Sequence, residues 1–276
     1  MRVVETVAEA RAVCEEMARP LGLVPTLGGL HDGHVALFRR ARSENASVAV
    51  SLFLNPTQFG HGEDLASYPV DRDADLAMIE REGVDGAFVP SAGEVYPNGF
   101  STAVDVGTLG NVLEGASRPE HFKGVATVVC KLLSIARPDR AYFGQKDAQQ
   151  LLVVRRLNAD LNLGAEIVAV PTVREADGLA LSSRNAYLDD LERKAATVLH
   201  RSLRLARRLW EDGQTDAAEV KRRMRALISE EPLASIDYVS ITDPETLEEL
   251  DTPAPKALVS LAVRIGKTRL IDNLTL

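Results

Sequence analysis

The chain has 276 residues, a length that suits one large domain or two of medium size. Hydrophobic residues make up 45% of it and charged residues 26%, which is ordinary for a globular protein. Lysine and arginine number 32 against 40 acidic residues, and the net charge of −8 argues against a general polyanion-binding surface. We therefore expect no nucleic acid partner, while a local basic site for a small anion is compatible with this charge.

The N-terminal segment and the cysteines indicate the compartment. The opening MRVVETVAEARAVCEEM carries acidic residues early and lacks the apolar core of a signal peptide. No apolar run is long enough to cross a membrane. Cys14 and Cys130 fall within apolar helical patterns, which favours two buried thiols over a disulfide or a metal site. We expect a cytoplasmic protein with no membrane partner.

The first part of the chain alternates between apolar runs and helical patterns. The expected helices are 7–17, 35–45, 71–82, 124–138 and 148–161, and the expected strands are 21–25, 47–54, 86–90, 140–144 and 165–173. This alternation predicts an α/β domain at 1–173 with a Rossmann-like, mostly parallel sheet. The G-x-G-x-x-G fingerprint of dinucleotide-binding proteins is absent from the sequence.

The pattern of apolar residues changes after Val173. The stretch 174–187, READGLALSSRNAY, is polar, and we place a domain boundary at its start. Beyond it we expect helices at 190–210 and 215–228, a strand at 236–241 and a β-hairpin at 257–274. These elements predict a smaller α+β domain at 174–276. The basic run 221–225, KRRMR, is short and mixed with acidic residues, which favours a solvated helix face over a nucleic acid site.

The stretch 24–34, VPTLGGLHDGH, joins a strand end to a helix start through a Gly-Gly pair. Backbone N–H groups are unpaired at such a helix start, and the helix dipole there favours an anion. His31 and His34 are three residues apart, so they share one helix face. Two imidazoles beside a positive helix end predict a polyphosphate site, with the H-x-G-H signature of the nucleotidylyltransferase superfamily. The alternative is a capped surface helix with two incidental histidines.

Two further segments carry the residue types that bind phosphate. The run 143–147, FGQKD, again places a small residue and a lysine between a strand and a helix, although Lys146 in isolation would be an ordinary surface residue. The run 181–185, LSSRN, offers two hydroxyls and the guanidinium of Arg184, or serves as a polar linker. Gln58 and Gln150 are neutral amides that suit a hydroxyl-bearing carboxylate better than a polyphosphate.

Taken in order, PTLGGLHDGH, NPTQF, EGASRPEHFKGVATVV, FGQKDAQQL and ALSSRN resemble the pantoate–β-alanine ligase family from about Leu21 to Asn185. The resemblance implies that ATP and (R)-pantoate form pantoyl adenylate and pyrophosphate with Mg²⁺. β-Alanine then attacks the adenylate to give pantothenate and AMP. It also implies a homodimer. No cluster with metal-ligand spacing is present, so we expect Mg²⁺ to arrive with ATP rather than in a site of its own.

The resemblance also implies roles for individual residues. His34 would be the proton donor. Because both substrates are anions, we expect the catalytic set of His31, His34, Lys146 and Arg184, together with Mg²⁺, to offset their repulsion. Gln58 would contact pantoate and β-alanine, and Gln150 would contact pantoate. The implied ATP-binding residues are Leu27, Gly28, Gly29, Leu30, His31, Asp32, Gly33, His34, Gly144, Gln145, Lys146, Asp147, Val173, Leu181, Ser182, Ser183 and Arg184.

Other functions remain compatible with the motifs. An adenylyltransferase would leave AMP in its product, whereas a ligase releases it. A tRNA synthetase is disfavoured because the chain is acidic and too short for an anticodon domain. A non-catalytic nucleotide-binding regulator is disfavoured by the intact set of histidines, lysine and arginine. The ligase interpretation requires the turns at 27–34 and 144–147 to converge on one nucleotide, and it suggests that the C-terminal domain acts as a lid.

Overall fold

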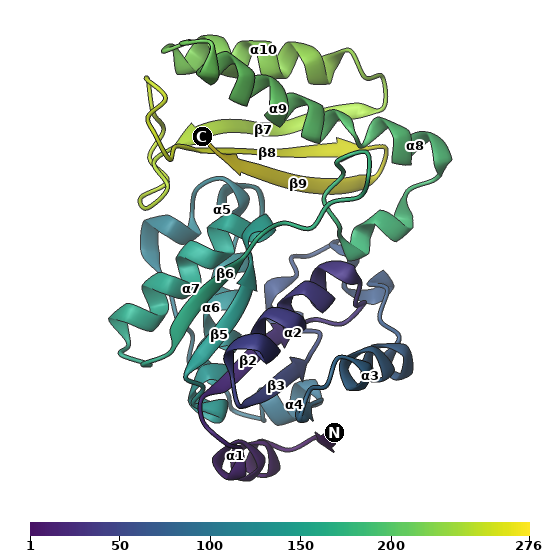
Figure 1. The fold of residues 1–276 in the computed structure, drawn as a ribbon, viewed down its shortest axis with the longest axis vertical. Helices are drawn as coiled ribbons and strands as arrows, with labels where there is room; N and C mark the ends of the chain where they lie inside the picture. The colour runs from purple at the N-terminus through teal and green to yellow at the C-terminus, as the bar shows by residue number, and fades with distance from the viewer.

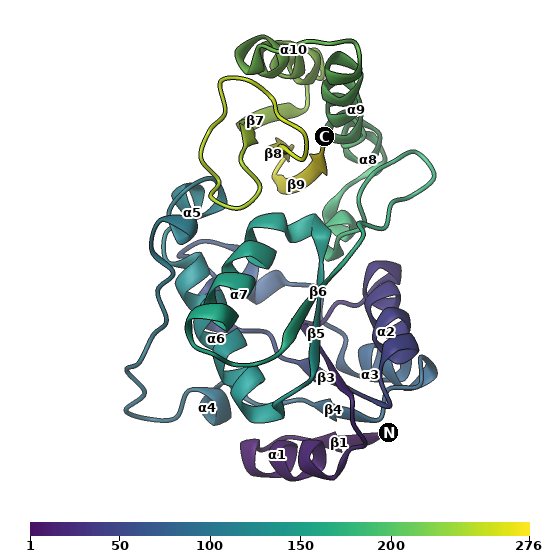
Figure 2. The same ribbon diagram turned by 60° about the vertical axis from the view of Figure 1, so that its left-hand side comes forward.

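All 276 residues are described by the computed structural model, which contains two β-sheets (Figures 1 and 2). The larger has six parallel strands in the order β1-β4-β3-β2-β5-β6. Its strands are β1 (Arg2–Val4), β2 (Leu21–Thr26), β3 (Ser47–Leu52), β4 (Gly86–Phe88), β5 (Arg140–Gly144) and β6 (Glu166–Val170). The helices around it are α1 (Val7–Glu16), α2 (Asp32–Glu44), α3 (Arg72–Arg81), α4 (Ala92–Val95), α5 (Glu114–Ser117), α6 (His121–Ala136) and α7 (Ala148–Asp160).

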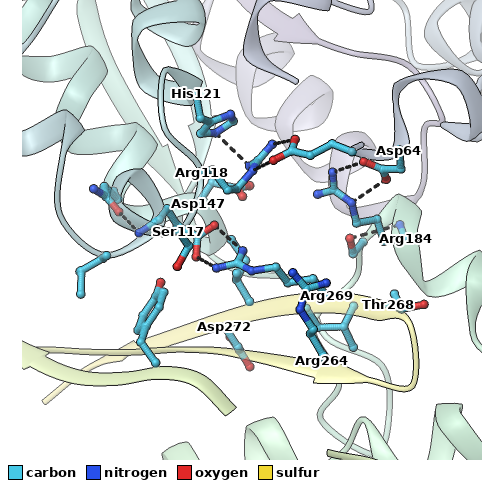
Figure 3. Close-up of a pocket in the computed structure, with 18 of the residues that line it drawn as sticks. Asp64, Ser117, Arg118, His121, Asp147, Arg184, Arg264, Thr268, Arg269 and Asp272 are labelled. Atoms are coloured by element: carbon cyan, nitrogen blue, oxygen red, sulfur yellow. Dashed lines mark hydrogen bonds and ion pairs between the residues drawn. The ribbon is translucent and has the colours of Figure 1, made fainter. Parts of the chain in front are cut away.

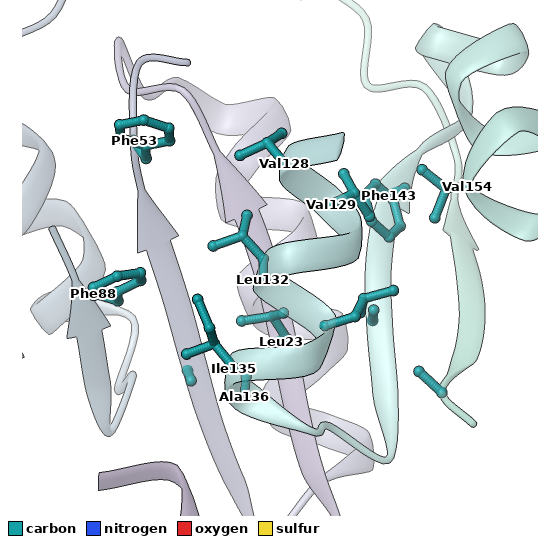
Figure 4. Packing of buried hydrophobic residues seen from close by; sticks show 14 of the residues in the cluster. Leu23, Phe53, Phe88, Val128, Val129, Leu132, Ile135, Ala136, Phe143 and Val154 are labelled. Carbon is teal, nitrogen blue, oxygen red and sulfur yellow. The ribbon is translucent and has the colours of Figure 1, made fainter. Parts of the chain in front are cut away.

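Helices cover both faces of this sheet because its strands are apolar on both faces. Along β2, Leu23 packs into the cluster made with α1, α6 and α7, while Val24 packs into the cluster made with α2 and α3. Ala49 and Val50 of β3 divide in the same way. Figure 4 shows α6 lying across the strands on the first of these faces. Continuous burial of this kind is what a parallel sheet requires.

The strand order reverses between β2 and β5, and in open α/β sheets such a switch point is where ligands bind. The two strands pair only through Gly22 and Leu23 at their start, although both continue beyond this point. Successive residues of a strand turn their backbone N–H and C=O groups to opposite neighbours. The carbonyl of Leu21 faces β5 and that of Thr26 faces β3, so the backbone nitrogen of Pro25 faces β5. Proline has no N–H to donate, which fits the separation of the strands at the carboxyl edge.

The second sheet is antiparallel and lies at the C-terminal end of the chain. Its strands are β7 (Ala234–Thr242), β8 (Leu258–Ile265) and β9 (Thr268–Thr275), in the order β7-β8-β9. One face packs against α9 (Val198–Glu211) and α10 (Ala217–Ser229), and the short α8 (Asp190–Ala195) precedes them. Figure 1 shows this sheet lying between those two helices and the larger sheet's unit, so its other face looks towards the carboxyl edge of the parallel strands.

The predicted α/β class with a smaller α+β part is confirmed, and several boundaries differ. Strand β1 went unpredicted because three residues at a sheet edge carry too little pattern. The expected helix 190–210 divides into α8 and α9, although Ala196 and Thr197 between them keep near-helical angles, so the break is a kink. Helix α6 begins at His121 rather than at Gly124. Strand β6 is shorter than expected and β7 is longer.

No helix has the length and apolar character that crossing a bilayer requires. Both cysteines are free thiols, and Cys14 is buried as expected. Cys130 is only partly buried, so the expectation of two buried thiols was wrong for that residue.

Candidate active site

An inner pocket of about 230 Å³ lies at the carboxyl edge of the parallel sheet. It is lined by the segments that follow β2, β3, β5 and β6, together with the 181–184 run. It opens into an outer cleft of about 1230 Å³ between the two sheets, shown in Figure 3. The two spaces share the lining residues Arg118, His121, Lys146, Asp147, Gln150, Ser182 and Arg184.

Most of the residues implicated by the motifs meet in the inner pocket. Those that line it are Leu27, His31, Gly33, His34, Gln58, Gly144, Lys146, Asp147, Gln150, Val173, Leu181, Ser182, Ser183 and Arg184. Five candidates do not line it, namely Gly28, Gly29, Leu30, Asp32 and Gln145. The turns at 27–34 and 144–147 are far apart in the chain, but they follow β2 and β5, which are neighbours in the sheet. They therefore converge on one pocket.

The two histidines of the H-x-G-H motif form the start of α2. His31 is the N-cap, and its Nδ1 accepts the N–H of Gly33 at 3.1 Å. Its own N–H donates to Nδ1 of His34 at 3.2 Å, and the two ring centroids are 4.3 Å apart. An imidazole that accepts at Nδ1 carries its proton on Nε2. Both rings therefore keep an Nε2–H available as a donor in the pocket.

These histidines are neutral, which corrects the expectation that they supply positive charge. Burial lowers the pKa of His31 to about 4, helped by the charge of Lys146. Burial, together with His31 and Lys146, lowers the pKa of His34 to about 3. Because desolvation disfavours the charged imidazolium, the formal positive charge in this part of the pocket resides on Lys146.

Two of the loop N–H groups expected to be unpaired are instead bonded within the protein. The carboxylate of Asp75, on α3, accepts the N–H of Gly29 at 2.9 Å and that of Leu30 at 2.8 Å. Asp75 is 3% exposed, and burial raises its pKa. Gly29 has a φ of +65°, and a Cβ there would approach the carbonyl oxygen of Pro69 at 2.7 Å. This loop is therefore fixed by the protein before any ligand arrives.

Gln58 is buried in the short 3-10 turn Pro56–Gln58 that follows β3. Its Oε1 accepts a hydrogen bond from Nδ2 of Asn55 at 3.0 Å. Oδ1 of Asn55 accepts from the hydroxyl of Tyr96 at 2.7 Å, which fixes the orientation of the Asn55 amide. With its Oε1 held by Asn55, Gln58 offers its NH₂ group as a donor to a ligand in the pocket.

Arg118 and His121 surround the other side of the same turn. Nδ1 of His121 lies 2.7 Å from the carbonyl oxygen of Gln58, and its Nε2 lies 3.1 Å from Nη1 of Arg118. Arg118 pairs with both carboxylate oxygens of Glu63 at 2.7 and 2.6 Å. Burial and the charge of Arg118 lower the pKa of His121 to about 4. This network holds the backbone of the Gln58 turn.

Arg184 and Ser183 bring the late polar run to the pocket. Arg184 forms a bidentate ion pair with Asp64, with Nε and Nη2 each 2.8 Å from a carboxylate oxygen. The Ser183 hydroxyl donates to the carbonyl oxygen of Gly29 at 2.8 Å. The guanidinium of Arg184 lies at the pocket as expected. Its Nη1 is the nitrogen that Asp64 does not contact. Figure 3 shows Arg118 and the Arg184–Asp64 pair on the same side of the outer cleft.

Sequence reasoning missed several residues that shape this site. Asp75 lies within a run of acidic residues on a helix, and nothing in its pattern separates it from exposed Asp73. Asn55 appeared only as part of the NPTQF motif. Arg118 and His121 stand in the EGASRPEHF motif, one on each side of Pro119, and their polar side chains were the available signal. No group of three or more His, Cys, Asp or Glu side chains is arranged to hold a metal ion.

Comparisons with known proteins agree on one family. The sequence profile described as Pantoate-beta-alanine ligase matches residues 2–275. The pantothenate synthetase of Roseiflexus castenholzii is 57% identical over 99% of this chain and 98% of its own length. That of Heliobacterium modesticaldum is 55% identical over 99% of both.

Solved structures give the same result. The crystal structure of pantothenate synthetase from Thermus thermophilus has a TM-score of 0.95, with 50% identity over 100% of this chain and 99% of the other. The enzyme from Francisella tularensis, complexed with β-γ ATP and β-alanine, has a TM-score of 0.82 and 33% identity over 100% and 97%.

Proposed function

Because this chain belongs to the pantoate–β-alanine ligase family and condenses (R)-pantoate with β-alanine through a pantoyl adenylate, we propose that the inner pocket carries out both steps. The observation that supports this proposal is the convergence of the 27–34 and 144–147 turns on one pocket. The Francisella tularensis enzyme, described with β-γ ATP and β-alanine, supports these two ligands here.

In the first step a carboxylate oxygen of pantoate attacks the α-phosphorus of ATP. The bond from the α-phosphorus to the bridging oxygen breaks, and pyrophosphate leaves with that oxygen. Both reactants are anions, so Lys146 and Nη1 of Arg184 offset their repulsion. His31 and His34 act as neutral Nε2–H donors to phosphate oxygens, with His34 donating to the reacting phosphate. Losing one such preorganised donor typically costs about 3–4 kcal/mol in the transition state.

In the second step the amine of β-alanine attacks the acyl carbon of pantoyl adenylate. The carbon–oxygen bond to AMP breaks, AMP leaves as the anion, and the attacking neutral amine loses one proton to solvent as the amide forms. The NH₂ group of Gln58 contacts pantoate and β-alanine, and Gln150 contacts pantoate. Holding both partners in one pocket replaces a bimolecular encounter. ATP is surrounded by the leucine, glycine and serine residues of the motifs that line this pocket, namely Leu27, Gly33, Gly144, Leu181, Ser182 and Ser183.

Magnesium fits this arrangement as an ion that enters with ATP. Mg²⁺ prefers oxygen ligands and commonly combines one or two carboxylates with substrate phosphates. Asp147 is the only carboxylate that lines the inner pocket, and its nearest cation, Nζ of Lys146, is 3.7 Å away. Asp147 would hold the ion, which supplies neutralising charge when bound.

The part of the chain beyond Val173 acts as a lid that keeps water from the adenylate. The separate apolar clusters support a boundary between 1–173 and 174–276. Small-angle scattering with and without an ATP analogue tests closure, and unchanged dimensions would count against it. A homodimer in the cytoplasm is proposed from the family, and sedimentation equilibrium tests the dimer.

The assay that tests the residue roles is ATP–pyrophosphate exchange. Exchange in the wild type should require pantoate and proceed without β-alanine, because adenylation precedes the amine. His34→Ala and Lys146→Ala should each lower its rate by roughly 10²–10³-fold with the fold intact. Near-normal exchange in either variant would remove that residue from the catalytic set.

A further inference from the structure

The turn that carries Lys146 is held from the opposite sheet by one side chain. Nδ2 of Asn273, on β9, donates to the carbonyl oxygen of Gln145 at 3.0 Å and to that of Lys146 at 2.8 Å. Asn273 is 6% exposed. The residues from Gln145 to Asp147 form a single 3-10 turn between β5 and α7, and no side-chain cap at its start holds it. These carbonyls are therefore fixed by β9.

Asn273 is itself held in place from two directions. Its strand pairs with β8, where Ser260 is its partner. Its backbone N–H donates to Oδ1 of Asp272 at 2.8 Å. Asp272 is 3% exposed and forms a bidentate ion pair with Arg174 at 2.6 and 2.9 Å. The donor group therefore has little freedom, and the two carbonyls that accept from it have a fixed position.

The chemistry of the contact requires an asparagine. Two adjacent carbonyl oxygens need two N–H donors from one planar group, which an amide supplies and a carboxylate does not. An aspartate here would place a negative charge against two partly buried acceptors. Tying both carbonyls back towards β9 sets the direction in which the Cα–Cβ bond of Lys146 leaves the turn. It thereby sets where the ammonium group meets the nucleotide.

We propose that Asn273 is a positioning residue for Lys146, through which the C-terminal sheet sets the geometry of the ATP-binding turn. This inference rests on the role proposed for Lys146 in ATP binding. It adds that the C-terminal sheet contributes to adenylation as well as covering the cleft, because a residue of β9 acts on the first step.

The test compares Asn273→Asp with the control Arg207→Ala. Arg207 is exposed and bonds the carbonyl oxygen of Thr275 at 3.0 Å, so its loss disturbs β9 without touching the turn. Asn273→Asp should raise the KM for ATP and lower pantoate-dependent exchange, each at least about tenfold, while the KM for β-alanine stays within about twofold. The control should leave all three unchanged. If the aspartate variant does not fold, Asn273→Ser, which keeps one donor, replaces it. The same rise in the KM for ATP and the same loss of exchange are then expected.

A double variant separates positioning from a general loss of structure. If Asn273 acts through Lys146, Asn273→Asp should cause little further loss of exchange in a Lys146→Ala background, because interacting residues are not additive. Equal losses in both backgrounds, or an unchanged KM for ATP with only a lower melting temperature, would overturn the inference. Normal exchange in Lys146→Ala alone would instead show that the proposed function of that lysine is wrong.

Discussion

His31 and His34 lie with their ring centroids 4.3 Å apart, and each ring accepts a backbone N–H at Nδ1. Each therefore directs an Nε2–H towards the pocket without carrying a charge. Donors that are already neutral and oriented need no deprotonation or rearrangement when the triphosphate binds. The arrangement also makes the fold sensitive to acid.

The free energy of unfolding should fall as the pH drops below about 6.5. An unfolded histidine titrates near pH 6.5, whereas in the fold the pKa of His31 is about 4 and that of His34 about 3. Between these values the unfolded chain binds more protons, so stability rises with pH, by at most about 1.4 kcal/mol per pH unit for each histidine. Urea denaturation at pH 4.5–7.5 measures this. His34→Gln should flatten the slope, and exposed His61→Gln should not. Equal slopes in all three proteins would contradict the neutral assignment.

Gln58→Glu should raise the KM for pantoate by roughly 10²-fold and leave the KM for ATP nearly unchanged. Asn55 donates to Oε1 of Gln58, which leaves the NH₂ group as the donor end of the wild-type side chain. A glutamate removes those donors and places a negative charge beside the pantoate carboxylate, and hydrogen bonds to charged groups contribute about 1.5–3 kcal/mol each. Steady-state kinetics with pantoate varied provide the measurement. A KM for pantoate within twofold of the wild type would show that Gln58 does not contact it.

Gln149 and Gln150 are neighbours on α7 that should behave in opposite ways. Gln149 accepts the N–H of Glu114 at 3.0 Å and donates to the carbonyls of Leu109 and Val112 at 2.9 and 2.8 Å. Gln149→Ala should therefore lower stability by about 2–3 kcal/mol. Gln150→Ala should raise the KM for pantoate about tenfold with stability changed by less than about 0.5 kcal/mol. Thermal unfolding and steady-state kinetics on both variants measure these effects. A large loss of stability in Gln150→Ala, or a raised KM for pantoate only in Gln149→Ala, would contradict the prediction.

Asp75→Asn should slow ATP–pyrophosphate exchange about 10–100-fold. Both carboxylate oxygens of Asp75 accept loop N–H groups, and an asparagine keeps one acceptor while setting its own N–H against the other donor. The loop that delivers the two histidines would then lose its fixed form. Asp73→Asn, at an exposed position on the same helix, is the matched control. Equal exchange rates in the two variants would mean that Asp75 has no role in holding the loop.

The α/β class and most of the candidate site could be predicted from the sequence. The motifs fall in strand-to-helix turns, and a parallel sheet brings all such turns to its carboxyl edge. His31, His34, Lys146 and Arg184 carried recognisable chemistry in short motifs. The charge state of the histidines was not predictable, because it depends on burial and on Lys146, which lies far along the chain. Asp75 and Asn273 were also missed, since each acts by a contact between distant elements that local patterns do not record.

The structure of the complex with α,β-methylene ATP, which adenylation cannot cleave, tests the central claim most directly. The account predicts that Nε2 of His34 and Nζ of Lys146 both lie about 3 Å from oxygens of the same triphosphate. A triphosphate bound by only one of the two turns, with the other facing empty solvent, would contradict it.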